Sequence, residues 1–204
     1  MEIYLVSNNL FENNLSYNDR HDIEKKKMTR PLSVEGELLA KKIAVEEMFA
    51  DTKLIYSSMF SSSLASAKYL AERINKKIIV DEDLNDCKVG ELGSRNLKTV
   101  KFMQNHDFNI KLNGGESLTE VGNRISRVIN RIINLDTTKV VVYTHKRAML
   151  GYLVLNCDVG YNLDDNLVVE YNEKVIYSDT LRDADIIKLT IQGRKLVDVD
   201  VIDL

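Results

Sequence analysis

The sequence predicts an α/β fold, a three-layer sandwich in which helices flank a mostly parallel sheet. Two observations carry this prediction: strand-like segments alternate with helix-like segments, and polar residues follow the predicted strands at one edge. The strand candidates, rich in β-branched and apolar residues, are Ile3–Val6, Leu54–Tyr56, Ile78–Val80, Val140–Tyr143 and Ile186–Ile191. Segments of helical periodicity separate the first four, which is the pattern of parallel strands joined by crossover helices.

The clearest predicted helix runs over Leu118–Asn134. Its apolar residues recur at three- and four-residue spacing and form one stripe. Ser117 and Glu120 have the spacing of a capping box, which predicts a start at Leu118. Three further helices are expected: one from about Val34 to Phe49 with Ser33 as N-cap, one over about Ser62–Ile74, and one directly after His145.

The pattern changes near the C-terminus. From about residue 163 the chain is β-rich, with strand candidates at Leu167–Tyr171, Val175–Tyr177 and Leu196–Ile202 joined by short polar turns. We expect an antiparallel edge or appendage on the α/β core, within a single domain over residues 1–204. The polar segment Asn8–Arg30 is predicted to be a surface loop beside the carboxyl end of the first strand.

Composition excludes several classes of protein. Lys and Arg number 28 against 31 Asp and Glu, a net charge of −3, which disfavours a generic nucleic-acid binder. No apolar stretch approaches the roughly 18 residues of a membrane span. The two cysteines and three histidines lack the spacing of a disulfide framework or a metal site, so we expect no metal, no cofactor and a cytoplasmic location. A homodimer is compatible with the sequence, but no motif requires one.

Polar residues that follow separate strands are expected to form one pocket. Ser7-Asn8-Asn9, Ser57-Ser58 and Thr144-His145 each come after a predicted strand, and the carboxyl ends of parallel strands meet at the edge where ligands bind. The glycine-rich segment Gly114–Ser117 brings Glu116 to a helix start, where free N–H groups favour anions. His145 and Glu116 are therefore the candidate catalytic residues. The alternatives are a structural histidine at a strand end and a loop carboxylate that faces a helix dipole.

At this point the sequence resembles the histidine phosphatase superfamily, which has the phosphoglycerate mutase-like fold. The resemblance covers most of residues 1 to about 155 and rests on six motifs in the family's order. They are a first strand running into Ser7-Asn8-Asn9, then Pro31-Leu32-Ser33-Val34-Glu35-Gly36, Tyr56-Ser57-Ser58 with the following helix start, the acidic loop Leu84–Gly93, Gly114-Gly115-Glu116-Ser117 with Arg124, and Val140–His145. The resemblance implies the fold predicted above and phosphoryl chemistry at a histidine.

Three positions depart from the family pattern. Asn8 stands where the family has the histidine that becomes phosphorylated, and Ser7 and Ser62 stand where it has the two arginines that grip phosphate. An amide nitrogen delocalises its lone pair into the carbonyl, so Asn8 cannot form a phosphohistidine. His145 and Glu116, the candidate acid or base, are retained, as is Asn14, which would face the phosphate.

Lys146 and Arg147 occupy the two positions after His145 where the family usually has small residues. Two placements are open: the side chains turn inward and bind an anion, or they lie on the solvent side of the helix, as basic side chains usually do. With Ser7, Asn8, Asn14 and Ser62 they make up the predicted substrate-binding set.

Two functions are compatible with these observations. The first is a pseudophosphatase that binds a phosphorylated or acidic small molecule, or a protein partner, without catalysis. The second is a divergent hydrolase in which His145 and Glu116 activate water or a different nucleophile. The resemblance and its departures favour the first.

Overall fold

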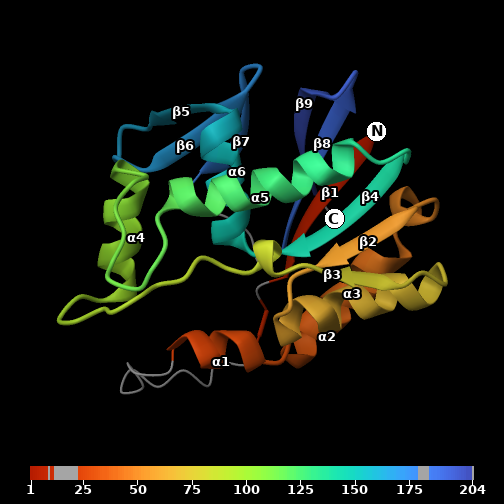
Figure 1. Ribbon diagram of the computed structural model, residues 1–204, viewed down its shortest axis with the longest axis horizontal. Coiled ribbons are helices and arrows are strands. Elements are labelled where there is room, and N and C mark those ends of the chain that lie inside the picture. Colours follow the sequence, from red (N-terminus) through yellow and green to blue (C-terminus); the bar gives the residue numbers. More distant parts are fainter. Residues whose placement is uncertain (9, 12–22, 179–183, 204) are drawn as a thin grey trace.

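The chain folds around a central sheet covered by helices on both faces (Figure 1). A computed structural model describes residues 1–8, 10–11, 23–178 and 184–203. The sheet has the strand order β3-β2-β4-β1-β8-β9. Its strands are β1 (Glu2–Asn8), β2 (Leu54–Ser57), β3 (Ile78–Val80), β4 (Lys139–Thr144), β8 (Ala184–Gln192) and β9 (Lys195–Ile202). The predicted three-layer α/β fold is confirmed.

The pairing of the strands makes the sheet mixed but mostly parallel. β1 and β2 both pair in parallel with β4, and β3 pairs in parallel with β2. β8 runs antiparallel to β1, and β9 antiparallel to β8, so the C-terminal hairpin forms the edge beyond β1. The carboxyl ends of β1, β2 and β4 therefore lie at the same edge of the sheet.

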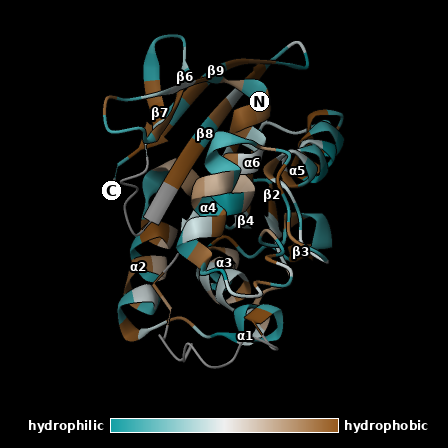
Figure 2. Cartoon of the chain, turned by 90° about the vertical axis from the view of Figure 1, so that its left-hand side faces the viewer, coloured by the Kyte–Doolittle hydropathy of each residue, from teal (hydrophilic) through white to brown (hydrophobic). Residues whose placement is uncertain are grey.

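Alternation along the strands divides the core into two layers. Ile3 and Leu5 of β1 pack with α5 (Leu118–Ile133) and α6 (Lys146–Asn156), while Tyr4 and Val6 pack with α2 (Val34–Val45) and α3 (Ser61–Arg73). Successive side chains of a strand point to opposite faces, so one strand serves both layers. Figure 2 shows the result, with brown hydrophobic residues along the strands and mixed colouring on α2, which has one buried face.

The predicted helix starts are found where the caps indicate. Ser117 accepts a hydrogen bond from the N–H of Glu120, and the Glu120 carboxylate accepts one from the N–H of Ser117, which completes the capping box of α5. Ser33 caps α2 through the N–H of Gly36. Each fully buried aliphatic side chain in the α5 stripe contributes on the order of 1.5–3 kcal/mol to stability.

The C-terminal β-rich part splits between two sheets. β5 (Asp158–Tyr161), β6 (Leu167–Tyr171) and β7 (Lys174–Ser178) form a separate antiparallel sheet, which begins before residue 163. β8 and β9 join the central sheet instead. Both an edge and an appendage are therefore present, where the sequence left the choice open.

Two helices depart from the prediction. α1 (Ile23–Thr29) lies inside the segment predicted to be a loop, and α4 (Leu97–His106) was not predicted. Neither has an apolar stripe: α1 has no buried residue, and the buried residues of α4 are Val100, Gln104 and Asn105. Polar contacts to neighbouring loops hold both helices, and periodicity does not report such contacts. Short 3₁₀ turns occur at Glu47–Phe49 and Glu82–Leu84.

Among the described residues, no helix combines the length and apolar character that a membrane span requires.

Candidate functional site

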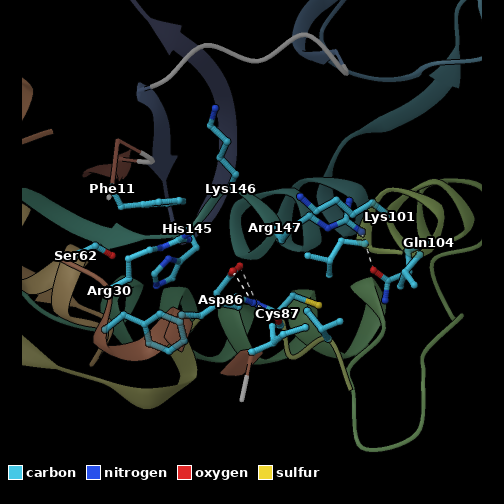
Figure 3. A pocket seen from close by; sticks show the side chains of 16 residues that line it. Phe11, Arg30, Ser62, Asp86, Cys87, Lys101, Gln104, His145, Lys146 and Arg147 are labelled. Carbon is cyan, nitrogen blue, oxygen red and sulfur yellow. Dashed lines mark hydrogen bonds and ion pairs between the residues drawn. The ribbon is translucent and has the colours of Figure 1, made fainter. Parts of the chain in front are cut away.

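A pocket of about 390 Å³ opens at the carboxyl edge of the parallel strands (Figure 3). Side chains from α1, α3, α4, α6 and the acidic loop surround it. Its lining consists of Phe11, Ile23, Lys27, Arg30, Phe60, Ser62, Asp86, Cys87, Val89, Leu97, Val100, Lys101, Gln104, His145, Lys146 and Arg147. Five of these side chains are basic and one is acidic, so the pocket is suited to an anion.

His145 lies between the end of β4 and the start of α6. Its Nε2 is 2.9 Å from Ser58 Oγ and 3.4 Å from Ser63 Oγ, and its ring packs against Phe60 at 4.6 Å between centroids. Loss of water around the ring, reinforced by the nearby charges of Lys27 and Arg124 and opposed by Asp86, lowers the pKa of His145 to about 4. The imidazole is therefore neutral at pH 7.

Two helices begin at the pocket. The N-cap residues are Phe60 for α3 and His145 for α6, and within the described chain neither makes a side-chain capping hydrogen bond. Neither N-cap side chain occupies the first N–H groups of its helix, and each helix N-terminus carries about half a positive charge. Ser62 lies in the first turn of α3, with 6% of its surface exposed, and adds a hydroxyl.

α1 and the segment after it supply two further cations. Lys27 Nζ lies 2.9 Å from Asp86 Oδ2 and donates to the carbonyl of Cys87 at 2.8 Å. Burial opposes ionisation of Asp86, but the charge and hydrogen bond of Lys27 outweigh it and hold the pKa of that carboxyl well below its usual range. The Arg30 guanidinium lies over the Phe11 ring, 3.1 Å from its centroid.

Arg30 has a buried donor, Nε, that no described residue engages. Burial lowers the pKa of Arg30 to about 10, with Asp86 acting in the opposite direction, so the side chain still carries its charge at pH 7. A buried donor without a partner costs about 1–3 kcal/mol, which an anion would recover.

Glu116 lies outside the pocket, which corrects its expected place beside His145. Arg124 Nε donates to Oε1 at 2.9 Å and Nη2 to Oε2 at 3.0 Å, and the N–H of Lys88 also donates to Oε2. Burial raises the pKa of Glu116, but these hydrogen bonds outweigh it and leave the pKa below its usual range. Glu116 is thus half of a bidentate ion pair and faces a different, open surface.

The other predicted residues fall into three groups. Ser62, Lys146 and Arg147 line the pocket with His145. Ser7 is completely buried and is not among the lining residues. The side chain of Asn8 and the whole of Asn14 lie outside what the structure describes.

The register still places Asn8 beside the pocket. Ser7 pairs with Thr144, so Asn8 and His145 are the next residues on two neighbouring strands. Asn8 therefore lies at the same strand ends as His145.

Sequence analysis missed Lys27, Arg30, Asp86 and Lys101. A partial signal existed for two of them: Lys27 ends a run of three lysines, and Asp86 lies in the acidic loop that resembles the family's. Arg30 directly follows α1 and Lys101 lies on α4, the two helices that periodicity does not reveal. Among the described residues, no group of three or more His, Cys, Asp or Glu side chains is arranged to hold a metal ion.

A sequence model described as "Histidine phosphatase superfamily (branch 1)" matches residues 17–169, more than half of the chain. The chain belongs to the histidine phosphatase superfamily. The match includes Ser58, Asp86, Glu116 and His145, and it begins after Ser7 and Asn8. No curated protein sequence matches the chain significantly.

Solved structures of histidine phosphatases share the fold over nearly the whole chain. The mycobacterial glucosyl-3-phosphoglycerate phosphatase in complex with inorganic phosphate matches with a TM-score of 0.69 at 13% identity, covering 99% of this chain and 95% of that one. The α-ribazole phosphatase from Shigella flexneri matches with a TM-score of 0.65 at 13% identity, covering 100% and 96%. At such identities the likeness shows the fold.

Glu116→Gln should separate a structural carboxylate from a catalytic one. Loss of the charge leaves Arg124, only 8% exposed, without its ionic partner, so the free energy of unfolding should fall by about 1–3 kcal/mol. Affinity for inorganic phosphate should not change, because the carboxylate lies outside the pocket. Urea unfolding and calorimetry measure the two quantities, with the exposed loop carboxylate variant Glu91→Gln as control. A stable Glu116→Gln variant with weakened phosphate binding would contradict this placement.

The lowered pKa of His145 predicts how pH affects stability. Between about pH 6.5 and 4 the unfolded state binds a proton at this residue and the folded state does not. The free energy of unfolding of the wild-type protein should therefore fall relative to that of His145→Gln as the pH drops through that window. Above pH 6.5 the difference between the two proteins should not change with pH. Titration of the imidazole by NMR should give a pKa near 4, and a value near 6.5 would overturn the assigned environment.

Proposed function

We propose that this histidine phosphatase superfamily member binds the phosphate group of a small molecule in the His145 pocket and does not form a phosphohistidine. It would act as a pseudophosphatase with a ligand-binding or regulatory role. The observation that carries the proposal is the pairing of a cationic pocket, five basic side chains against one acidic, with asparagine at the nucleophile position.

The phosphate is held by groups that replace the missing arginines. The N-termini of α3 and α6 supply N–H donors, the Ser62 hydroxyl lies in the first turn of α3, and Arg30 supplies a guanidinium that lines the pocket. Helix N-termini bind phosphate through this combination of donors and dipole. The neighbours named above are phosphatases of small phosphorylated molecules, which supports the same ligand class here.

The groups that standard catalysis requires are missing or otherwise engaged. The amide of Asn8 offers no nucleophilic lone pair. Glu116 is held by Arg124, and Asp86 is ionised beside Lys27, so neither carries a proton for a leaving group at neutral pH. General acid catalysis needs a protonated group within hydrogen-bond reach of the leaving oxygen.

One observation favours a second candidate, a divergent hydrolase. A neutral imidazole 2.9 Å from a serine hydroxyl is the arrangement of a base with its nucleophile. Ser58 is completely buried and is not among the lining residues, so a substrate does not reach it in this arrangement. In a hydrolase, His145 would instead take a proton from a water molecule in the pocket.

Inorganic phosphate should bind the wild-type protein with a Kd of about 1 mM by calorimetry. Arg30→Met removes a charge-assisted contact and should weaken binding about tenfold. Arg95→Met, an exposed arginine that does not line the pocket, is the matched control and should bind as the wild type does. Absence of phosphate binding, or unchanged binding in Arg30→Met, would contradict the proposed site.

The same protein, mixed with an aryl phosphate and quenched within a single turnover, should contain no acid-labile phosphoenzyme. Formation of such an intermediate would refute the pseudophosphatase assignment. Turnover without a phosphoenzyme, abolished in His145→Ala, would select the hydrolase. Its rate should then rise as the pH passes the pKa of His145 near 4 and level off above it.

A further inference from the structure

The pocket has two polar ends, and part of its wall is apolar. Figure 3 shows Ser62, Arg30 and His145 on one side, and Arg147, Lys101 and Gln104 on the other. The lining also contains Cys87 and the apolar side chains Val89, Leu97 and Val100. Burial raises the pKa of the Cys87 thiol to about 12, so it stays neutral and behaves as part of the apolar wall.

Arg147 is held in place by two amide side chains. Its Nη1 donates to Asn105 Oδ1 at 2.6 Å and its Nη2 to Gln104 Oε1 at 2.9 Å. An amide oxygen carries no formal charge, so these two bonds orient the guanidinium without cancelling its charge. The clamp restricts the long side chain to one side of the pocket.

The amide clamp is itself fixed. Gln104 is 4% exposed, and its Nε2 donates to the carbonyls of Glu116 at 2.8 Å and Ile110 at 3.2 Å. These donations determine which end of the amide faces Arg147. The loop that ends in Glu116, anchored by Arg124, therefore sets the position of Arg147 through Gln104.

The second sheet supports the helix that carries the clamp. Tyr161 Oη of β5 donates to the carbonyl of Asn105 at 2.8 Å, and the Tyr161 ring stacks on His106 at 5.0 Å between centroids. His106 Nε2 lies 3.1 Å from Asp165. α4 is thus supported from its outer side, and its inner side faces the pocket.

Lys101 of α4 adds a second cation at this end. Although much of the residue is exposed, loss of water around its amine lowers its pKa, and the charge of Arg147 lowers it further. Two neighbouring cations repel each other, and an anion between them removes that cost. This end of the pocket is therefore built to take negative charge.

We propose that Arg147 and Lys101 form a second anion subsite, and that the pocket takes a ligand with two anionic groups. The phosphate lies at the His145 end, and a carboxylate or second phosphate lies at the Arg147 end, joined by a short, mainly apolar body along Val89, Leu97 and Val100. This inference rests on the proposed function, because the first anion is the phosphate bound beside His145. Arg147 and Lys101 then determine specificity, and Gln104 is a positioning residue for Arg147.

Non-hydrolysable probes test the second subsite by calorimetry. The matched pair is hexylphosphonate, with one anionic group, and ω-phosphonohexanoate, with a carboxylate at the far end; butyl analogues test a shorter span. The two-anion probe should bind at least about tenfold more tightly than its partner, because tenfold in affinity corresponds to about 1.4 kcal/mol, which one charge-assisted hydrogen bond can supply. Hexane bisphosphonate shows whether a second phosphate is preferred to the carboxylate.

The ratio of the two affinities is the readout in the variants. Arg147→Met should bring the ratio to about one, and Lys101→Met should lower it, whereas Lys98→Met, an exposed lysine of the same helix outside the pocket, should leave it as in the wild type. Arg30→Met should weaken both probes and preserve the ratio. If Arg147→Met does not fold, Lys101→Met alone tests the second subsite, since Lys101 is exposed and is not part of the amide clamp.

The outcomes separate this inference from the proposed function. If both probes bind equally in the wild type, or if the preference survives in both Arg147→Met and Lys101→Met, the second subsite is wrong and the phosphate site stands. If neither the probes nor inorganic phosphate binds, the proposed function itself fails.

Discussion

The guanidinium of Arg124 is the contact on which the pocket depends. It is 8% exposed, and its nitrogens donate to the Glu116 carboxylate and to the carbonyls of Asp83, Asn85 and Asp86. Arginine has five N–H donors in a fixed plane, and here they make five bonds. Two loops far apart in the sequence are thereby tied to one side chain of α5. The burial of α5 against the sheet thus fixes both loops at the edge where the strands end.

Each loop then positions a different part of the pocket. The first carries Asp86, whose carboxylate holds Lys27 and through it the short helix α1 that precedes Arg30. The second presents the Glu116 carbonyl to Gln104, which orients Arg147. Removing Arg124 would leave the Glu116 carboxylate without its ionic partner and would release the groups at both ends of the pocket, whereas loss of the Glu116 charge alone leaves the three carbonyl bonds of Arg124 in place. The retained glutamate of the glycine-rich loop therefore has a structural role in this arrangement.

How far the sequence predicts the structure depends on what holds each element. α5 has an apolar stripe and a capping box, and its start at Leu118 agrees with the prediction. The five predicted strands of the central sheet are all present, and in β1 and β4 the apolar residues face a helix layer on each side. α1 and α4 have few buried apolar residues and are held by contacts such as Lys27 with Asp86 and Asn105 with Tyr161. Such contacts join residues about 60 positions apart and leave no local pattern.

The candidate site, like the fold, is predictable only where a local sequence pattern or the topology fixes a residue. Strand ends are set by topology, so His145 and Ser62 were placed in one pocket correctly. The sequence places Glu116 in the pocket because it precedes a helix start. In the structure Arg124, two turns into that helix, donates hydrogen bonds to both Glu116 carboxylate oxygens and holds the side chain elsewhere. Arg30 follows, and Lys101 lies on, a helix that the sequence does not predict. Serine at positions 7 and 62 therefore suggests a less basic pocket than the structure has.

A crystal structure of the protein with phosphate tests the central claim most directly. The account predicts a phosphate bound non-covalently at the N-termini of α3 and α6, with a hydrogen bond from Arg30 and with the ion pair of Arg124 and Glu116 unchanged. A phosphate bound to Glu116 or Arg124 in place of that pair, or a phosphorus covalently attached to His145, would contradict it.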